Sequence, residues 1–195
     1  MSPRGGRWWW RRAFRMTLLL SAAGLLLTRP SFTSQLEADF PHHHPDRLAH
    51  FLADFTNYPN VYTHISGPWQ VVEEQSNLTW WRYTVSYECG TRCEGRLQLD
   101  HTQTPLDPSA GREHRVLVRD ERCSRVPLLP WPRICEDTHT ETSVSPRAGG
   151  GAKLAELSVS RCGLLGALTK ACGALDRDEV LRNWKRTLAE VSLQQ

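Results

Sequence analysis

Apolar residues recur along the chain with two periods, one typical of helices and one typical of strands. Between residues 34 and 40, apolar side chains at every second position predict a half-buried strand. After Pro45, which suits the first turn of a helix, apolar positions follow the i, i+3, i+4, i+7 spacing of one helical face. That face consists of Leu48, Phe51, Leu52 and Phe55. The pattern therefore predicts a strand followed by a short amphipathic helix.

The predicted helix leads into the segment DFTNYP, residues 54–59. Polar residues interrupt the apolar stripe there, and Pro59 disfavours helical geometry at Tyr58. A second short helix is predicted at 60–65. We interpret Asp54 as bonding the turn, while Tyr58 and Pro59 set the angle between the two helices. The alternative interpretation places Tyr58 at the mouth of a ligand cavity.

From Trp69 onward the apolar positions alternate with a period of two. Within 79–88, Trp81, Tyr83 and Tyr87 share a large aromatic face, and the opposite face is mostly polar. The following CGTRC segment is a hairpin signal. Further strands are predicted at 93–101, 112–122, 134–145 and 153–162. These segments describe an antiparallel meander.

The phase of each strand predicts which side chains face inward. Gly95, Leu97 and Leu99 share the inward face of their strand, and Leu157 with Val159 are assigned to the apolar face of the last one. The chain then returns to a helical period, with a capping-box-like start at Asp176 and Glu179. Its apolar stripe consists of Val180, Leu181, Trp184, Leu188 and Val191. The expected order is strand, two helices, five strands and a long helix, an α+β class domain over residues 34–195.

Residues 1–33 have the composition of a targeting segment. Five arginines precede an apolar run of 12 residues, Met16–Leu27, and no acidic residue occurs before Glu37. The run is shorter than the roughly 18–20 residues that span a bilayer. We expect a signal peptide or a signal-anchor, and hence a secreted protein or a single-pass protein with a luminal domain. A mitochondrial presequence is the alternative, since it is also rich in arginine and poor in acids.

The targeting segment also accounts for the basic charge of the chain. The formal net charge is +3, but six arginines lie in the segment, and the remainder carries 18 basic and 21 acidic residues. No basic patch with interleaved aromatic residues appears in this remainder. We therefore expect no nucleic-acid partner.

Six cysteines follow the targeting segment, which indicates disulfides formed in an oxidising compartment. Of the 15 possible connectivities, we expect the sequential set, in which each pair brackets one turn-rich loop. Those pairs are Cys89 with Cys93, Cys123 with Cys135, and Cys162 with Cys172. Buried free thiols are the alternative. No zinc-like spacing occurs, so no metal site is expected.

Asn77, followed by Leu78 and Thr79, forms an acceptor triplet for N-linked glycosylation. The triplet lies in a polar stretch between two strand-like segments, where a surface turn is expected. Together with the targeting segment and the cysteines, it supports passage through the secretory pathway.

The element order, with DFTNYP at the first helix–helix junction, resembles the START-like superfamily, also called the polyketide cyclase and lipid-transport (SRPBCC) superfamily. That group includes the mitochondrial coenzyme-Q-binding proteins, and its members often carry a D-x-x-x-Y-P turn after the first helix. The resemblance implies a helix-grip fold, in which a curved antiparallel sheet wraps around a long C-terminal helix and leaves a cavity. Six cysteines and a luminal location would be unusual for this group.

The resemblance implies that the domain binds, or transfers, a hydrophobic small molecule or lipid in its cavity. The candidate ligand contacts are Trp81, Tyr83, Tyr87, Leu97, Leu99, Trp131 and Trp184. Each of them could equally fill the core. Loops such as the one from Leu128 to Trp131 sometimes gate the cavity or contact a membrane in this superfamily, and the N-terminal segment is a second possible membrane contact.

Two other functions stay open. The first is an enzyme of the cyclase or hydrolase type on the same fold, whose scattered acid–base candidates are His101, His114, Glu136 and His139. No nucleophile–base pair, phosphate-binding loop or metalloprotease motif accompanies them, and no cofactor is expected. The second is a disulfide-stapled interaction domain whose own aromatic side chains fill the interior.

Overall fold

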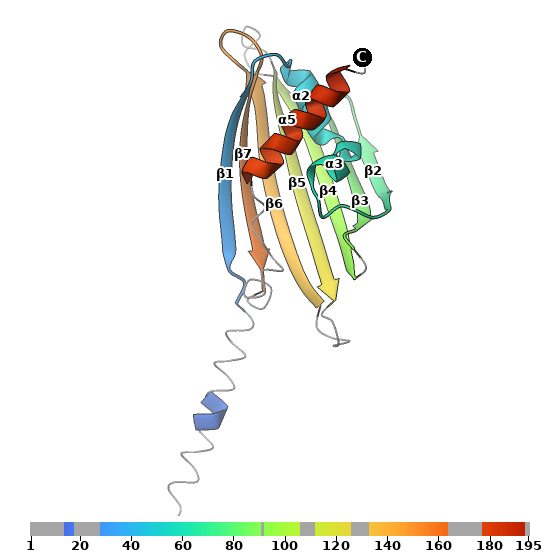
Figure 1. Ribbon diagram of the computed structural model, residues 1–195, viewed down its shortest axis with the longest axis vertical. Helices are drawn as coiled ribbons and strands as arrows, with labels where there is room; N and C mark the ends of the chain where they lie inside the picture. Colours follow the sequence, from blue (N-terminus) through green and yellow to red (C-terminus); the bar gives the residue numbers. More distant parts are fainter. Residues whose placement is uncertain are drawn as a thin grey trace, which may run out of the picture.

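The computed structural model of the protein describes residues 14–17, 28–90, 92–105, 112–125, 133–163 and 177–193. In this part of the chain, seven strands form one antiparallel sheet, and helices lie across one of its faces, here called the inner face (Figure 1). The elements are β1 (Ser31–Phe40), α2 (Pro45–Ala53), the 3-10 helix η1 (Phe55–Asn57), α3 (Tyr58–Val61), β2 (Trp69–Ser76), β3 (Trp80–Glu88), β4 (Cys93–Pro105), β5 (Arg112–Arg125), β6 (Arg133–Pro146), β7 (Ala152–Cys162) and α5 (Arg177–Leu193).

The strand order is β1-β7-β6-β5-β4-β3-β2. Strands β2 to β7 therefore form the predicted meander, and β1 pairs with the last strand. The structure has six strands after the first helices, where the sequence predicted five. The additional strand, β2, is an exposed edge strand with an irregularity in its pairing between Val71 and Glu73, and this irregularity breaks the alternation that marks a strand in the sequence.

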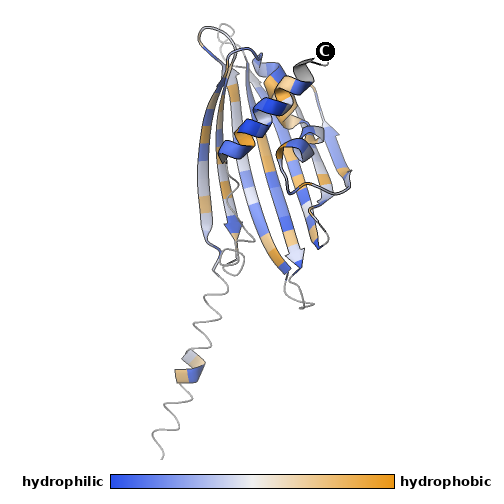
Figure 2. Ribbon diagram, viewed as in Figure 1, coloured by the Kyte–Doolittle hydropathy of each residue, from blue (hydrophilic) through white to orange (hydrophobic). Residues whose placement is uncertain are grey.

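Hydrophobic and hydrophilic bands alternate along the strands (Figure 2). The predicted inward positions are confirmed on β4, where Leu97 and Leu99 are at most 2% exposed, and Val85 of β3 is buried beside them. Helix α2 packs mainly over β5 and β6, and its Leu48 and Leu52 are buried in the same hydrophobic cluster. The hydrophobic core therefore lies between α2 and the centre of the sheet.

The DFTNYP junction has the predicted structural role. Asp54 ends α2 and caps η1, with its Oδ1 accepting hydrogen bonds from the backbone N of Thr56 (2.9 Å) and from its hydroxyl (2.7 Å). The prediction that Tyr58 leaves helical geometry is wrong, because Tyr58 begins α3 with φ −63° and ψ −41°. Pro59 occupies the first turn of that helix, where no N–H is needed, and Tyr58 donates to the carbonyl of Leu52 (3.1 Å). The second helix is accordingly earlier than the predicted 60–65.

Helix α5 lies across the same face of the sheet as α2 and α3 (Figure 1). Trp184, 4% exposed, packs edge-on against Phe51 of α2 and Tyr58 of α3. Asn183 adds a hydrogen bond to the carbonyl of Val61 (3.1 Å). The α+β architecture with a C-terminal helix over an antiparallel sheet is thus present, and the contacts of Trp184 and Asn183 join α5 to the other two helices.

The predicted phase of the last strand is wrong. Leu157 of β7 is 40% exposed on the outer face, whereas Leu154, Glu156 and Ser158 are buried on the inner face. The hydrophobicity pattern failed because part of the inner face is polar. The polar part of the inner face is where the candidate functional site lies.

The disulfides Cys89–Cys93 and Cys123–Cys135 are present as predicted. Cys162 is also disulfide-bonded, and its expected partner, Cys172, lies outside the described residues. So do Trp131, Leu128 and most of the targeting segment. No helix in the described ranges is long and apolar enough to cross a membrane.

Candidate functional site

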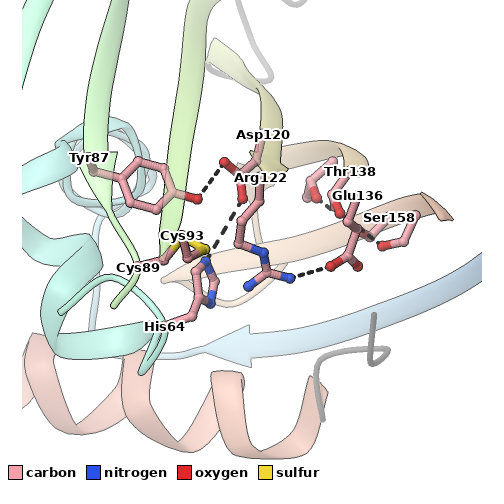
Figure 3. A network of polar contacts seen from close by, with 11 residues as sticks. His64, Tyr87, Cys89, Cys93, Asp120, Arg122, Glu136, Thr138 and Ser158 are labelled. Atoms are coloured by element: carbon pink, nitrogen blue, oxygen red, sulfur yellow. Dashed lines mark hydrogen bonds and ion pairs between the residues drawn. A yellow bond between two sulfur atoms is a disulfide. The ribbon is translucent and has the colours of Figure 1, made fainter. Parts of the chain in front are cut away.

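The inner face of the sheet changes character along the strands. On β5, the buried Val116 and the neighbouring Val118 are followed at the same phase by Asp120 and Arg122. The register places Glu136 of β6 opposite Arg122. We call the side chains of His64, Tyr87, Asp120, Arg122 and Glu136 the inner polar network (Figure 3).

Tyr87 enters this network by crossing a neighbouring strand. Its register partner on β4 is Gly95, and its hydroxyl donates to Asp120 on β5 at 2.7 Å. A Cβ atom built on Gly95 would lie 2.1 Å from Cζ of the tyrosine ring. The absence of a side chain at Gly95 therefore lets the ring lie flat enough to reach the next strand.

Replacing Gly95 with Ala is expected to displace the Tyr87 ring and break its bond to Asp120. Because the ring is buried, we expect a cost of about 1–3 kcal/mol in the free energy of unfolding, measured by urea denaturation. In a Tyr87→Leu background the same substitution should cost less than about 0.5 kcal/mol. Equal costs in both backgrounds would contradict the assigned contact.

Arg122 and Glu136 form a buried ion pair, with side chains 16% and 6% exposed. Burial raises the pKa of Asp120 to about 6, although the hydrogen bond from Tyr87 and the charge of Arg122 act in the opposite direction. Asp120 therefore changes protonation near neutral pH. Strongly perturbed carboxyl groups of this kind are concentrated at functional sites.

His64, in the segment after α3, closes the network from the helical side. Its Nε2 lies 3.8 Å from Asp120 Oδ2. Burial, with a contribution from the charge of Arg122, lowers the pKa of His64 to about 3, so the imidazole is neutral at physiological pH. Its Nδ1 is buried and has no hydrogen-bond partner among the described residues. Such a group is costly unless a water or a ligand satisfies it.

Hydroxyl groups continue the polar surface onto the next two strands. Thr138 bonds Ser160 (3.0 Å) and Thr140 bonds Ser158 (2.9 Å), each pair linking β6 to β7 on the inner face. The polar part of the inner face thus extends over β5, β6 and β7.

A small pocket lies where the apolar and polar parts meet. Its free volume is about 30 Å³, enough for one water molecule. The segment from Tyr58 to Ile65 forms one wall, and β4, β5 and β6 form the other. The lining side chains are Tyr58, Tyr62, His64, Ile65, Leu97, Val118, Asp120, Arg122, Thr138 and Thr140.

The structure brings the predicted ligand contacts together only in part. Tyr87 belongs to the polar network and Leu97 lines the pocket, whereas Leu99 and Trp184 are packed in the core. Tyr83 accepts a hydrogen bond from the backbone N of Phe55 (2.8 Å) and also donates to the carbonyl of Ala53. That these residues contact a ligand stays a prediction.

Two of the scattered histidines lie together under α2. His114 Nε2 is 2.7 Å from Asp46 Oδ1, and His114 Nδ1 is 3.2 Å from His101 Nε2. Donation to the carboxylate leaves His114 Nδ1 as the acceptor from His101. His101 is fully buried against Trp81, with ring centroids 3.9 Å apart, and its Nδ1 has no described partner. The chain Asp46–His114–His101 connects the start of α2 to the sheet.

The other acid–base candidates are separated from these. Glu136 pairs with Arg122, and His139 is on the outer face of β6. Within the described ranges, Glu121 lies near the sulfurs of Cys123 and Cys135. These two cysteines are joined in a disulfide, so they offer no thiolate to a metal ion.

No protein-family model and no curated protein matches the sequence. Among solved structures, the Mll3558 protein from Rhizobium loti is 17% identical, with a TM-score of 0.41, covering 84% of this chain and 98% of its own. The hypothetical protein jhp0584 from Helicobacter pylori is 11% identical, with a TM-score of 0.45 and coverages of 84% and 88%. Ara h 8.0201 is 11% identical, with a TM-score of 0.40 and coverages of 82% and 99%. All three scores are below 0.5, so these likenesses identify neither a family nor a ligand.

Proposed function

We propose that this domain binds an amphipathic small molecule or lipid between the inner face of the sheet and the helices, as a START-like helix-grip protein does. The observation that carries the proposal is the pocket beside the inner polar network. Apolar side chains of Leu97, Val118 and Ile65 would contact the hydrophobic part of the ligand. Asp120 and Arg122 would contact its polar part.

A buried acceptor atom in the pocket that lacks a described hydrogen-bond partner supports ligand binding there. His64 Nδ1 is buried without a described partner, and a ligand hydroxyl could donate to it. A free volume of about 30 Å³ is far smaller than a lipid. Binding therefore requires the segment from Tyr58 to Ile65 to move away from the sheet, in the manner of a gate.

Native mass spectrometry of the protein secreted by eukaryotic cells tests the proposal. We expect a co-purified small molecule in the wild type and a smaller bound fraction in Val118→Trp, which fills the pocket. Leu117→Trp is the matched control, because it adds the same side chain at the next position of β5, on the outer face. A wild-type protein without any bound mass would contradict the proposal, and so would equal binding by the two variants.

We also propose that the protein enters the secretory pathway, with residues 1–33 as signal peptide or signal-anchor. Disulfide bonds are consistent with an oxidising compartment. Membrane contact through that segment or through the Leu128–Trp131 loop remains a prediction.

Glycosylation at Asn77 tests the secretory assignment. Asn77 is exposed in the turn between β2 and β3, and Leu78 beside it is fully exposed. In mammalian cells we expect an electrophoretic shift on endoglycosidase digestion, and Asn77→Gln should abolish it. An unshifted wild type with six alkylatable thiols would favour the mitochondrial alternative.

A further inference from the structure

A second hollow, separate from the inner polar network, lies at the edge of the sheet beside α2 and η1. Its volume is about 470 Å³, and we call it the edge groove. Aromatic side chains form its walls, among them Phe55, Trp69, Trp81 and Tyr83. Trp69 is 40% exposed and meets Phe55 edge-on, with ring centroids 5.2 Å apart. The groove therefore presents aromatic surface to small molecules in solution.

The irregularity in β2 gives this aromatic groove a negative charge. Val71 pairs with Val85, but after one extra residue Glu73 pairs with Thr84 and Glu74 with Tyr83. Regular alternation from Val71 would have put Glu73 on the inner face. The extra residue turns Glu74 inward instead and leaves Glu73 on the outer face.

Asp54 supplies a second carboxylate on the opposite side of the groove. Its Oδ1 caps η1, and its Oδ2 has no hydrogen-bond partner in the described part of the chain. Burial raises the pKa of Tyr83 well above its usual value, and both Asp54 and Glu74 contribute to that shift. Among the described lining residues there is no lysine or arginine. The lining also includes His50, so two carboxylates face one imidazole and no permanently charged base, which gives the aromatic walls a negative potential.

From this geometry we infer that the edge groove binds a small soluble organic cation carrying a quaternary, trimethylated ammonium group. The faces of tryptophan and tyrosine rings attract such cations through their quadrupoles. The two carboxylates add Coulomb attraction without a strong preference for direction, which suits an ion that has no N–H donors. An anion would be repelled, and a neutral apolar molecule would gain only the contact with the rings.

The test compares choline with 3,3-dimethyl-1-butanol, in which carbon replaces the charged nitrogen. Saturation-transfer NMR detects the nine-proton methyl singlet of either compound on the protein purified from the secretory pathway of eukaryotic cells. We expect choline to bind at least about fivefold more tightly than the neutral compound. Equal affinities, or no binding of choline, would overturn the inference. Binding to phosphatidylcholine vesicles without binding to free choline would also overturn the inference, because the site would then recognise a membrane surface and not a soluble cation.

Matched variants locate the site. Glu74→Gln is expected to weaken choline binding about three- to tenfold, whereas Glu73→Gln, on the outer face of the same strand, should leave it unchanged. Trp69→Leu keeps an apolar side chain at an exposed position and should weaken choline binding at least about fivefold. An equal effect of the two glutamate variants would show a general charge effect and contradict the groove. Circular dichroism and thermal unfolding verify that each variant is folded.

Discussion

Replacing Arg122 with Met, while Glu136 remains, is expected to lower the free energy of unfolding by about 3–5 kcal/mol. Glu136 is buried and Arg122 is largely buried on the inner face, and the substitution leaves the Glu136 carboxylate without its counter-ion. Glu136→Leu should cost a similar amount, because it leaves the guanidinium of Arg122 uncompensated. Urea denaturation at neutral pH with intact disulfides measures both values.

The double variant R122M/E136L should recover most of the loss. Two apolar side chains of similar size avoid the desolvation of both charges, and exchanges of this kind are often neutral or stabilising. The double variant removes from Asp120 the charge of Arg122, which lowers its pKa, and the charge of Glu136, which raises it less. The net change is therefore an upward shift of the pKa of Asp120. We expect the double variant to lie within about 1 kcal/mol of the wild type.

The ion pair of Arg115 and Glu141 on the outer face provides the control. Its side chains are 53% and 37% exposed, so Arg115→Met should cost less than about 1 kcal/mol. If Arg122→Met costs no more than Arg115→Met, the inner polar network is not buried as described.

The same variants separate stability from function. A charged pair that apolar residues can replace without loss of stability is not needed for folding. If the network holds a ligand, R122M/E136L should be stable and yet lose the co-purified molecule. Retention of that molecule would show that Arg122 and Glu136 serve only the fold.

The apolar half of the fold could be predicted from the sequence because hydrophobicity marks the inside there. The alternation within β3, the inward positions on β4 and the helical stripe of α2 all follow this rule. The two disulfides in the described residues could also be predicted, because each joins cysteines that are close in the sequence, 4 and 12 positions apart.

The polar half could not be predicted in this way. Glu136, Thr138 and Ser158 are polar, so hydrophobicity does not mark their burial or partial burial on the inner face. The apolar Leu157 led to the assignment of β7 to the wrong face. One sequence feature indicated the polar inner surface. On β5, Asp120 and Arg122 occupy the same alternate positions, and so the same face, as Val116 and Val118. Charged residues in phase with buried valines indicate a polar inner surface, provided that the strand is long enough to extend past the core.

The histidine chain depended on register, which the sequence pattern does not specify. His114 pairs with Gln103 rather than with His101, so the two histidines meet diagonally across β4 and β5. The third member, Asp46, comes from α2 and lies 68 positions away from His114 in the sequence. Only the packing of that helix on the sheet brings all three together.

Lowering the pH from 7 to 4 is expected to destabilise the protein by several kcal/mol. Burial, together with the charges of His114 and His50, lowers the pKa of His101 in the folded state to about 4, from an ordinary value of 6.5. The unfolded chain therefore takes up a proton at His101 at higher pH than the folded protein does. The stability that neutral His101 provides is complete above pH 6.5 and is lost as the pH falls toward 4. His64, with a folded pKa of about 3, acts in the same direction.

Asp120 opposes this trend. Its folded pKa of about 6 exceeds the ordinary 3.8, so the folded state binds its proton first and gains stability as the pH falls through that interval. With about 1.4 kcal/mol per pKa unit, the two histidines outweigh the one carboxyl group and leave a net loss of roughly 4 kcal/mol at pH 4.

Urea denaturation at pH 7, 5.5 and 4 measures this loss, and His101→Gln identifies its source. Glutamine does not titrate, so this variant should be less stable than the wild type at pH 7 but should lose about 3 kcal/mol less on acidification. His139→Gln, on the outer face of β6, is the control and should keep the wild-type slope. A wild type whose stability is constant between pH 7 and 4 would contradict the burial of neutral imidazoles in this fold, and an unchanged slope in His101→Gln would assign the loss to other groups.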